Sequence, residues 1–159
     1  MLIGVISDTH DDMVQIRRAV EVLNKRDVSL VLHAGDYCAP FVFEFLRDLR
    51  APLKGIFGNN DGDRLLLQEK SGGALQVQPL VMELQGRRLV LMHEPPLLQA
   101  LATSGLFDVL IYGHLHEPEV RQAGRALILN PGKVARLHKG ESTLAVLDLQ
   151  SLQAELIKL

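Results

Sequence analysis

Short runs of Val, Ile and Leu recur along this chain, and several of them end just before an Asp, Asn or His residue. Runs of this length and content are typical of β-strands that are covered on both faces. The carboxyl ends of parallel strands meet at one edge of a sheet, and ligands bind at that edge in open α/β folds. The pattern therefore predicts an α/β fold with polar side chains gathered at one sheet edge. The polar residues that follow the runs are Asp8, Asp36, Asn59, His93 and His114.

The first third of the chain alternates these apolar runs with helical patterns. A helix is predicted from Met13, because apolar residues recur at helical spacing after it and Asp11 and Asp12 precede it as capping candidates. A second helix is predicted from Pro40 to about Leu49, since proline suits a first helical turn. The resulting β-α-β-α-β order predicts a parallel sheet with right-handed crossovers.

The second half of the chain has shorter strands with turn residues between them. Residues 80–84 and 88–92 flank Gln85-Gly86-Arg87, which indicates a hairpin, and residues 95–104 predict a short helix. We therefore expect an antiparallel second sheet and a two-sheet α/β sandwich. The further predicted strands are 107–112, 120–122, 126–129, 143–149 and 154–159.

Length and composition narrow the classes of protein. A chain of 159 residues predicts one domain over 1–159, and 47% hydrophobic residues suffice for a core. A formal charge of −2 argues against bulk nucleic-acid binding, and the absence of Trp argues against a base-stacking platform. The single cysteine, Cys38, excludes an internal disulfide and fits a reducing compartment. No basic leader or apolar run of membrane-spanning length occurs, so we expect a cytoplasmic protein without a membrane contact.

The strand-end residues have the chemistry of metal ligands. Asp8 and His10 stand two residues apart, as do His114 and His116. Imidazole and carboxylate groups suit Mn, Fe, Zn, Ni or Co, and no cysteine stands among the candidates, which argues against a structural zinc site. A mixed cluster of this size fits two divalent ions that share a carboxylate, a device used for displacement at phosphorus.

In their order and spacing these motifs resemble the calcineurin-like metallophosphoesterase superfamily. The most similar branch is the small bacterial and archaeal phosphodiesterases of the YfcE type, which also resembles the retromer subunit vacuolar protein sorting 29. The resemblance implies the two-sheet αββα sandwich of the metallophosphoesterases. The motifs are Asp8-Thr9-His10, Gly35-Asp36, Gly58-Asn59-Asn60-Asp61, His93, Gly113-His114-Leu115-His116 and the later turn Asn130-Pro131-Gly132.

The resemblance implies a role for each candidate ligand. It places Asp8, His10 and His116 on one ion, Asn59, His93 and His114 on a second, and Asp36 between the two. It assigns catalysis to Asp36, Asn59 and His93. The implied cofactors are two divalent ions, Mn²⁺ first, with Ni²⁺, Fe²⁺, Zn²⁺ or Co²⁺ as alternatives. A water shared by the ions would then attack a small-molecule phosphoester. The oligomeric state is left open, with a homo-oligomer among the alternatives.

Three positions depart from the family pattern. Larger members carry a histidine after the asparagine ligand, and this chain has Asn60, whose amide cannot act as a general acid near pH 7. Asp11 and Glu94 stand where glycine is common in the family. We expect these changes to affect substrate choice and turnover more than metal binding.

Other polar residues are expected to play supporting roles. Asp61 is expected to cap or to orient Asn59 or a histidine ligand by hydrogen bonding, His33 to be structural, and Cys38 to be a small buried apolar residue. For Lys133 and Arg136 the alternatives are contact with a substrate phosphate and, favoured, a solvated loop; His138 is expected to be exposed to solvent.

Three functions are compatible with these motifs. The first is a metal-dependent phosphodiesterase, and the second is a non-catalytic protein-interaction scaffold of the vacuolar protein sorting 29 type. The third is a phosphomonoesterase, which the missing acid at Asn60 disfavours. A scaffold needs no complete ligand set, whereas all seven candidate positions are filled here, so the enzyme is favoured.

Overall fold

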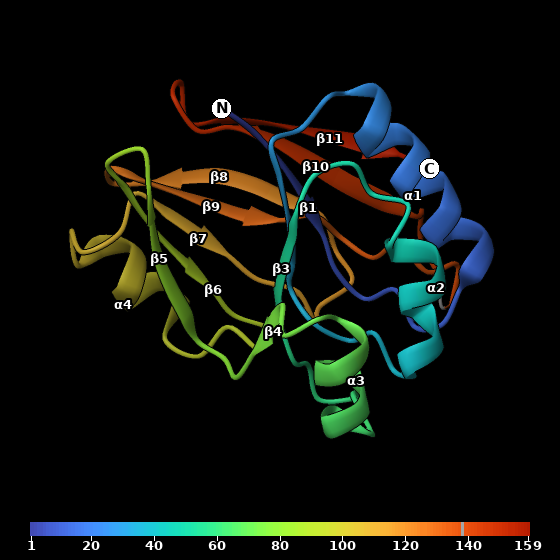
Figure 1. Ribbon diagram of the computed structural model, residues 1–159. Helices are drawn as coiled ribbons and strands as arrows, with labels where there is room; N and C mark the ends of the chain where they lie inside the picture. The colour runs from blue at the N-terminus through green and yellow to red at the C-terminus, as the bar shows by residue number, and fades with distance from the viewer. Residues whose placement is uncertain (138) are drawn as a thin grey trace.

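Two mixed β-sheets form the centre of the molecule in the computed structural model, which describes residues 1–137 and 139–159 (Figure 1). The expectation for His138 lies outside the described residues. The first sheet has the order β11-β10-β1-β2-β3-β4. Its strands are β1 (Leu2–Ile6), β2 (Leu30–His33), β3 (Leu53–Ile56), β4 (Leu75–Gln76), β10 (Thr143–Asp148) and β11 (Gln153–Lys158).

The second sheet has the order β5-β6-β7-β9-β8. Its strands are β5 (Leu80–Leu84), β6 (Arg87–Leu91), β7 (Val109–Ile111), β8 (Glu119–Ala123) and β9 (Ala126–Asn130). The helices are α1 (Met13–Lys25), the 3₁₀ turn η1 (Pro40–Val42), α2 (Phe43–Leu46), α3 (Arg64–Lys70) and α4 (Leu98–Thr103). Among the described residues, no helix is both long and apolar enough to span a bilayer.

Alternating side chains bury both faces of the central strands. Ile3 and Leu32 belong to the apolar cluster between the two sheets, whereas Ile6 and Val31 pack under the helices. A third cluster lies between the second sheet and α4. The layers are therefore helix, sheet, sheet, helix, which confirms the predicted αββα sandwich.

Helix α1 follows the predicted pattern. Ile16 and Leu23 are fully buried against the first sheet, and Asp12 caps the helix by accepting a hydrogen bond from the Gln15 backbone N–H at 3.2 Å. The other capping candidate, Asp11, instead accepts a hydrogen bond from the Ala39 backbone N–H at 3.0 Å. The helix predicted from residue 40 is split into η1 and the short α2.

The prediction of an antiparallel second sheet is wrong. Strands β6, β7 and β9 run parallel, while β10 joins the first sheet beside β1 and β11 pairs with β10. Turn residues mark where strands stop, but they carry no information on which distant strand is the partner. The apolar runs at 88–92 and 107–112 enclose α4 in a β-α-β unit, and such a unit favours parallel pairing.

The prediction of a solvated Lys133 is also wrong. Its side chain is fully buried, and its ammonium group donates hydrogen bonds to the carbonyl oxygens of Lys139 at 3.2 Å and Glu141 at 3.4 Å. Burial of the apolar stem of Lys133 is favourable, and the carbonyl dipoles compensate for the cost of burying its charge. Arg136 is exposed as expected and forms an ion pair with Asp12 at 3.0 Å.

Strand β3 passes close to the ring of Tyr37. The ring is fully buried and stacks on His33 with 3.8 Å between centroids, and no described residue hydrogen bonds with the Tyr37 hydroxyl. A Cβ at position 55 would overlap with that hydroxyl and lie 3.0 Å from the His33 carbonyl oxygen. Glycine at 55 therefore leaves the space that the tyrosine occupies.

We expect Gly55→Ala to lower the free energy of unfolding by about 1–3 kcal/mol, the usual cost of overpacking. Tyr37→Phe removes the overlapping hydroxyl, and loss of an unpaired buried hydroxyl costs little stability. The loss caused by Gly55→Ala should therefore be smaller in the Tyr37→Phe protein than in the wild type. Chemical denaturation of all four proteins in a double-mutant cycle measures this coupling, and strictly additive losses would contradict the contact.

Candidate metal centre

The candidate ligands lie at the carboxyl ends of strands from both sheets. Asp8, Asp36 and Asn59 follow β1, β2 and β3, while His93 and His114 follow β6 and β7. The strands β1, β2 and β3 are parallel to one another, and so are β6 and β7, so each sheet brings its ligands to one edge. Figure 1 shows these strand ends converging near the base of the molecule, above α3.

The backbone is left-handed at most of these positions. Such φ angles are uncommon outside glycine, although Asp, Asn and His tolerate them better than other residues, and they cluster at functional sites. The chain therefore turns sharply after these strands, and the side chains of neighbouring loops point toward one common region. The values are 54° at Asp8, 38° at His10, 62° at Asp36, 66° at His114 and 60° at His116.

One group of donor atoms combines the first and last motifs. His116 Nε2 lies 3.0 Å from Asp8 Oδ1, and His10 Nε2 lies 3.6 Å from the same oxygen. The two imidazole Nε2 atoms are 3.4 Å apart. The three side chains therefore direct one donor atom each at a common point.

A second group forms around Asn59. Its Oδ1 lies 2.8 Å from His93 Nε2 and 2.9 Å from His114 Nδ1. Asp36 lies between the two groups, because its Oδ2 is 3.4 Å from His93 Nε2 and 3.6 Å from His10 Nε2. The structure thus brings together all seven residues that the sequence singled out.

These separations suit metal coordination. An ion with bonds of about 2.0–2.2 Å brings neighbouring ligand atoms to roughly 3–3.6 Å from one another. The donor pairs in both groups lie in or close to this range. Two sets of donor atoms can each converge on an ion, namely Asp8 with His10 and His116, and Asp8 with Asp36 and His93. The donor set therefore fits divalent ions.

Hydrogen bonds hold the donor atoms in place. His93 Nδ1 lies 2.8 Å from the Ala34 carbonyl oxygen, so that nitrogen carries the proton and Nε2 is free to face Asn59. Asn60 donates to both oxygens of Asp36, from its backbone N–H at 2.8 Å and its side-chain amide at 2.7 Å. On the other carboxylate, Asp8 Oδ2 accepts hydrogen bonds from the Ser7 hydroxyl and the His114 backbone N–H.

Asp61 caps backbone N–H groups, which was one of the two roles expected for it. It does not orient Asn59 or a histidine; its carboxylate accepts hydrogen bonds from backbone N–H groups on two loops. On the loop after β2 the donors are Asp36, Tyr37 and Cys38, and on the loop after β3 the donor is Gly58. Asp61 therefore ties together the loops that carry Asp36 and Asn59. No pattern in the sequence predicts these backbone partners.

Two further residues near the site were expected to be structural. His33 is fully buried beside Thr9, and burial lowers its pKa to about 3, so it stays neutral and confirms that expectation. Cys38 is only partly buried, so the expectation of a buried apolar residue is wrong, and its Sγ lies 3.3 Å from His10 Nδ1. Burial, together with the nearby carboxylates, raises the pKa of the Cys38 thiol to about 12, so it is no thiolate near neutral pH.

Opposite charges face each other in the site. Burial opposes ionisation of Asp8 and Asp36, but hydrogen bonds and the neighbouring histidines outweigh it, so the pKa of each carboxyl is lowered. The pKa of His10 is raised, chiefly by Asp8, and the pKa of His93 is raised by Asp36 against the effect of burial. The site is thus built to hold positive charge between two carboxylates.

Comparisons with known proteins agree with this geometry. The model of the calcineurin-like phosphoesterase superfamily domain matches residues 1–152. A phosphodiesterase of Methanocaldococcus jannaschii is 33% identical over 156 residues, which cover 94% of this chain and 94% of the relative. A solved archaeal phosphodiesterase superposes with a TM-score of 0.93 at 33% identity, and the match covers 100% of both chains.

More distant solved structures share the fold alone. The Escherichia coli phosphoesterase YfcE has a TM-score of 0.75 at 20% identity, covering 99% of this chain and 98% of that one. Vps29 of Entamoeba histolytica, solved with Zn²⁺, has a TM-score of 0.70 at 21% identity and covers 99% of both chains. The family match over residues 1–152 and the archaeal relatives at 33% identity show that the chain belongs to the calcineurin-like phosphoesterase superfamily.

Proposed function

We propose that this chain is a phosphodiesterase that hydrolyses a small organic phosphate ester with two divalent metal ions, Mn²⁺ in the first place. The observation that carries the proposal is the position of Asp36, whose Oδ2 lies 3.4 Å from His93 Nε2 and 3.6 Å from His10 Nε2. One oxygen thus reaches both donor groups, which suits a carboxylate that two ions would share. When bound, such ions supply Lewis acidity toward phosphoryl oxygens and a water that ionises near neutral pH.

The side chains have distinct parts in this proposal. Asp8, His10 and His116 hold one ion, Asn59, His93 and His114 hold the other, and Asp36 offsets the repulsion between the two. Asn60 fixes both oxygens of Asp36, so its amide is engaged on the carboxylate. An amide donates no proton to a leaving group near pH 7. The reaction therefore favours esters whose leaving group departs as a stable anion.

A protein-interaction scaffold is the second candidate. The structural likeness to Vps29 extends to the fold, and because Vps29 itself was solved with Zn²⁺, donor atoms spaced for metal do not separate a scaffold from an enzyme. Activity toward bis(p-nitrophenyl) phosphate and p-nitrophenyl phosphate separates the three candidate functions, because a scaffold cleaves neither and a monoesterase prefers the second.

We expect two Mn²⁺ ions per chain at saturation. Asp36→Ala should abolish diesterase activity and reduce the metal content, because it removes the shared carboxylate, while the circular dichroism spectrum stays close to wild type. Plasma mass spectrometry gives the stoichiometry. The control is Asp48→Asn, an exposed carboxylate outside the site, which should keep both metal and activity. One tightly held ion together with a fully active Asp36→Ala protein would disprove the shared site.

We expect the rate to depend steeply on the pKa of the leaving group, so that aryl diesters react much faster than alkyl diesters. Asn60→His supplies a candidate acid and should speed poor leaving groups, toward the low end of the 10²–10⁴-fold effect of a positioned acid, since it also gives up the amide contact with Asp36. Rates for a series of substituted-phenyl diesters, plotted against the pKa of the leaving group, give the slope of this dependence. If chemistry is shown to limit the rate and the slope is flat, the proposal of unassisted departure fails.

Metal should also stabilise the fold, and more so above pH 7 than in acid. The raised pKa values of His10 and His93 mean that their protonation stabilises the metal-free fold below the ordinary value of 6.5. That contribution is lost as the pH rises through the raised pKa values, and metal then replaces the protons. Ions that bind only the folded state add about 2.7 kcal/mol at a hundredfold excess over Kd.

Thermal melts with Mn²⁺ and with chelator at several pH values test this dependence. The increase in Tm caused by Mn²⁺ should be largest near pH 8 and should shrink below about pH 6, because protons compete for the imidazoles. A Tm at pH 8 that does not change on chelation, with metal removal verified, would mean that the seven residues do not form the proposed site.

A further inference from the structure

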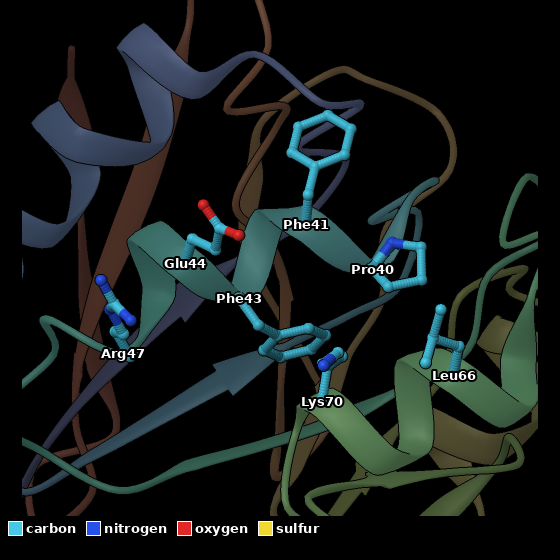
Figure 2. Close-up of a pocket in the computed structure, with 7 residues that line it drawn as sticks. All are labelled: Pro40, Phe41, Phe43, Glu44, Arg47, Leu66 and Lys70. Atoms are coloured by element: carbon cyan, nitrogen blue, oxygen red, sulfur yellow. The ribbon is translucent and has the colours of Figure 1, made fainter.

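A cavity of about 580 Å³ lies between the η1–α2 segment and α3, and none of the candidate metal ligands lines it (Figure 2). Figure 2 shows Phe43 and Lys70 in the space between the two helices, with Arg47 on the α2 side and Leu66 on α3. A cavity of this size suits a small organic ligand. The residues used below are Pro40, Phe43, Glu44, Arg47, Leu66 and Lys70.

Both walls of the cavity continue from loops that carry candidate ligands. Pro40 is four residues after Asp36, so at most about 14 Å of chain separates them. The wall on α3 begins shortly after Asn59, and its N-cap is Asp63. Leu66 lies in the first turn of α3, and Lys70 lies about 6 Å farther along the helix axis. Along the sequence, the apolar residues of the cavity therefore lie closer to the candidate ligands Asp36 and Asn59 than its basic residues do.

A stack of buried rings runs from the cavity toward the loop that carries Asp36. The Phe43 ring lies 5.6 Å from the Tyr37 ring at an interplanar angle of 27°, and Tyr37 stacks on His33. Tyr37 directly follows Asp36, and its backbone N–H is held by Asp61. The floor of the cavity and the candidate shared carboxylate are thus parts of one packed segment.

Two cations of this cavity lack an acidic partner. Arg47 and Lys70 are exposed, and neither forms an ion pair with a residue that the structure describes. Glu44 contributes one negative charge, so the cavity keeps a net positive charge in a chain of net charge −2. A cavity with a net positive charge attracts an anionic group.

We propose that this cavity binds the organic arm of the phosphodiester substrate, and that this arm consists of a planar apolar group followed by a second anionic group, as in a nucleotide. The inference rests on the proposed phosphodiesterase function. The planar group lies near Pro40, Phe43 and Leu66, and the second anion meets Arg47 and Lys70. The cavity thereby selects diesters by their distal charge.

Three diesters with the same leaving group test the proposal in the Mn²⁺-loaded protein. They are bis(p-nitrophenyl) phosphate, thymidine 3′-(p-nitrophenyl phosphate) and the same thymidine compound with a 5′-phosphate. The 5′-phosphate should lower KM, and each of Arg47→Gln and Lys70→Gln should raise KM for that compound by about fivefold, the upper range for an exposed ion pair. The value of kcat/KM for bis(p-nitrophenyl) phosphate, which has no distal charge, should change much less in both variants than the value for the 5′-phosphate compound.

Matched controls come from α1. Lys25 occupies the last turn of that helix as Lys70 does in α3, and Arg18 is an exposed arginine, so Lys25→Gln and Arg18→Gln should leave all three substrates unaffected. Binding is read independently in metal-free protein by titration with thymidine 5′-monophosphate. Nuclear magnetic resonance signals of Phe43 and Leu66 should shift, and the shifts should weaken in Lys70→Gln.

The outcomes separate this inference from the function on which it rests. If all three diesters are cleaved but the 5′-phosphate gives no advantage, or gives the same advantage in both cavity variants, the cavity proposal is overturned and the phosphodiesterase stands. If no diester is cleaved by protein with two bound ions, the proposed function fails. In that case the nucleotide titration still decides the cavity: shifts at Phe43 and Leu66 support binding there, and their absence overturns it.

Discussion

Two buried carboxylates, Asp8 and Asp36, are the constraint around which the molecule is arranged. Both side chains are almost fully excluded from solvent, and isolated buried charges of this kind are costly. The fold compensates them with backbone N–H groups, the Ser7 hydroxyl and the imidazoles of His10 and His93. Because the imidazoles can carry a proton or face a cation, the same arrangement tolerates the metal-free state and favours divalent ions.

The left-handed backbone at the strand ends has to be held in place by its surroundings, because such conformations are less favourable for residues other than glycine. Asp61 provides part of that support, since a single carboxylate receives N–H groups from the loops after β2 and β3. A charged acceptor makes these hydrogen bonds stronger than neutral ones. Asp61 thus fixes the relative position of Asp36 and Asn59 without facing the metal centre.

Much of the fold and of the candidate site could be predicted because both depend on local patterns. Apolar runs locate strands, and the carboxyl ends of parallel strands place Asp8, Asp36 and Asn59 together. The prediction failed where distant partners decide the structure. Strand β10 pairs with β1 across more than a hundred residues, and Lys133 is buried by carbonyl groups that no sequence pattern reveals. The short α3 is not among the predicted helices, although Asp63 caps it.

The candidate metal centre draws on both sheets, and this makes its geometry depend on the packing between them. Asp8, Asp36 and Asn59 extend from the first sheet, while His93, His114 and His116 extend from the second. The apolar cluster between the sheets, with Ile3, Leu32, Leu91, Ile111 and Leu129 among its members, sets the distance between the two halves.

Interiors are packed densely enough that a changed side-chain volume shifts neighbouring atoms. Metal coordination tolerates departures of only about 0.2 Å from ideal bond lengths. A residue in the middle of this cluster can therefore affect the relative position of Asp36 and His93 without touching either. In this fold the inter-sheet core therefore constrains the site as the candidate ligands do, because it aligns the two halves that carry them.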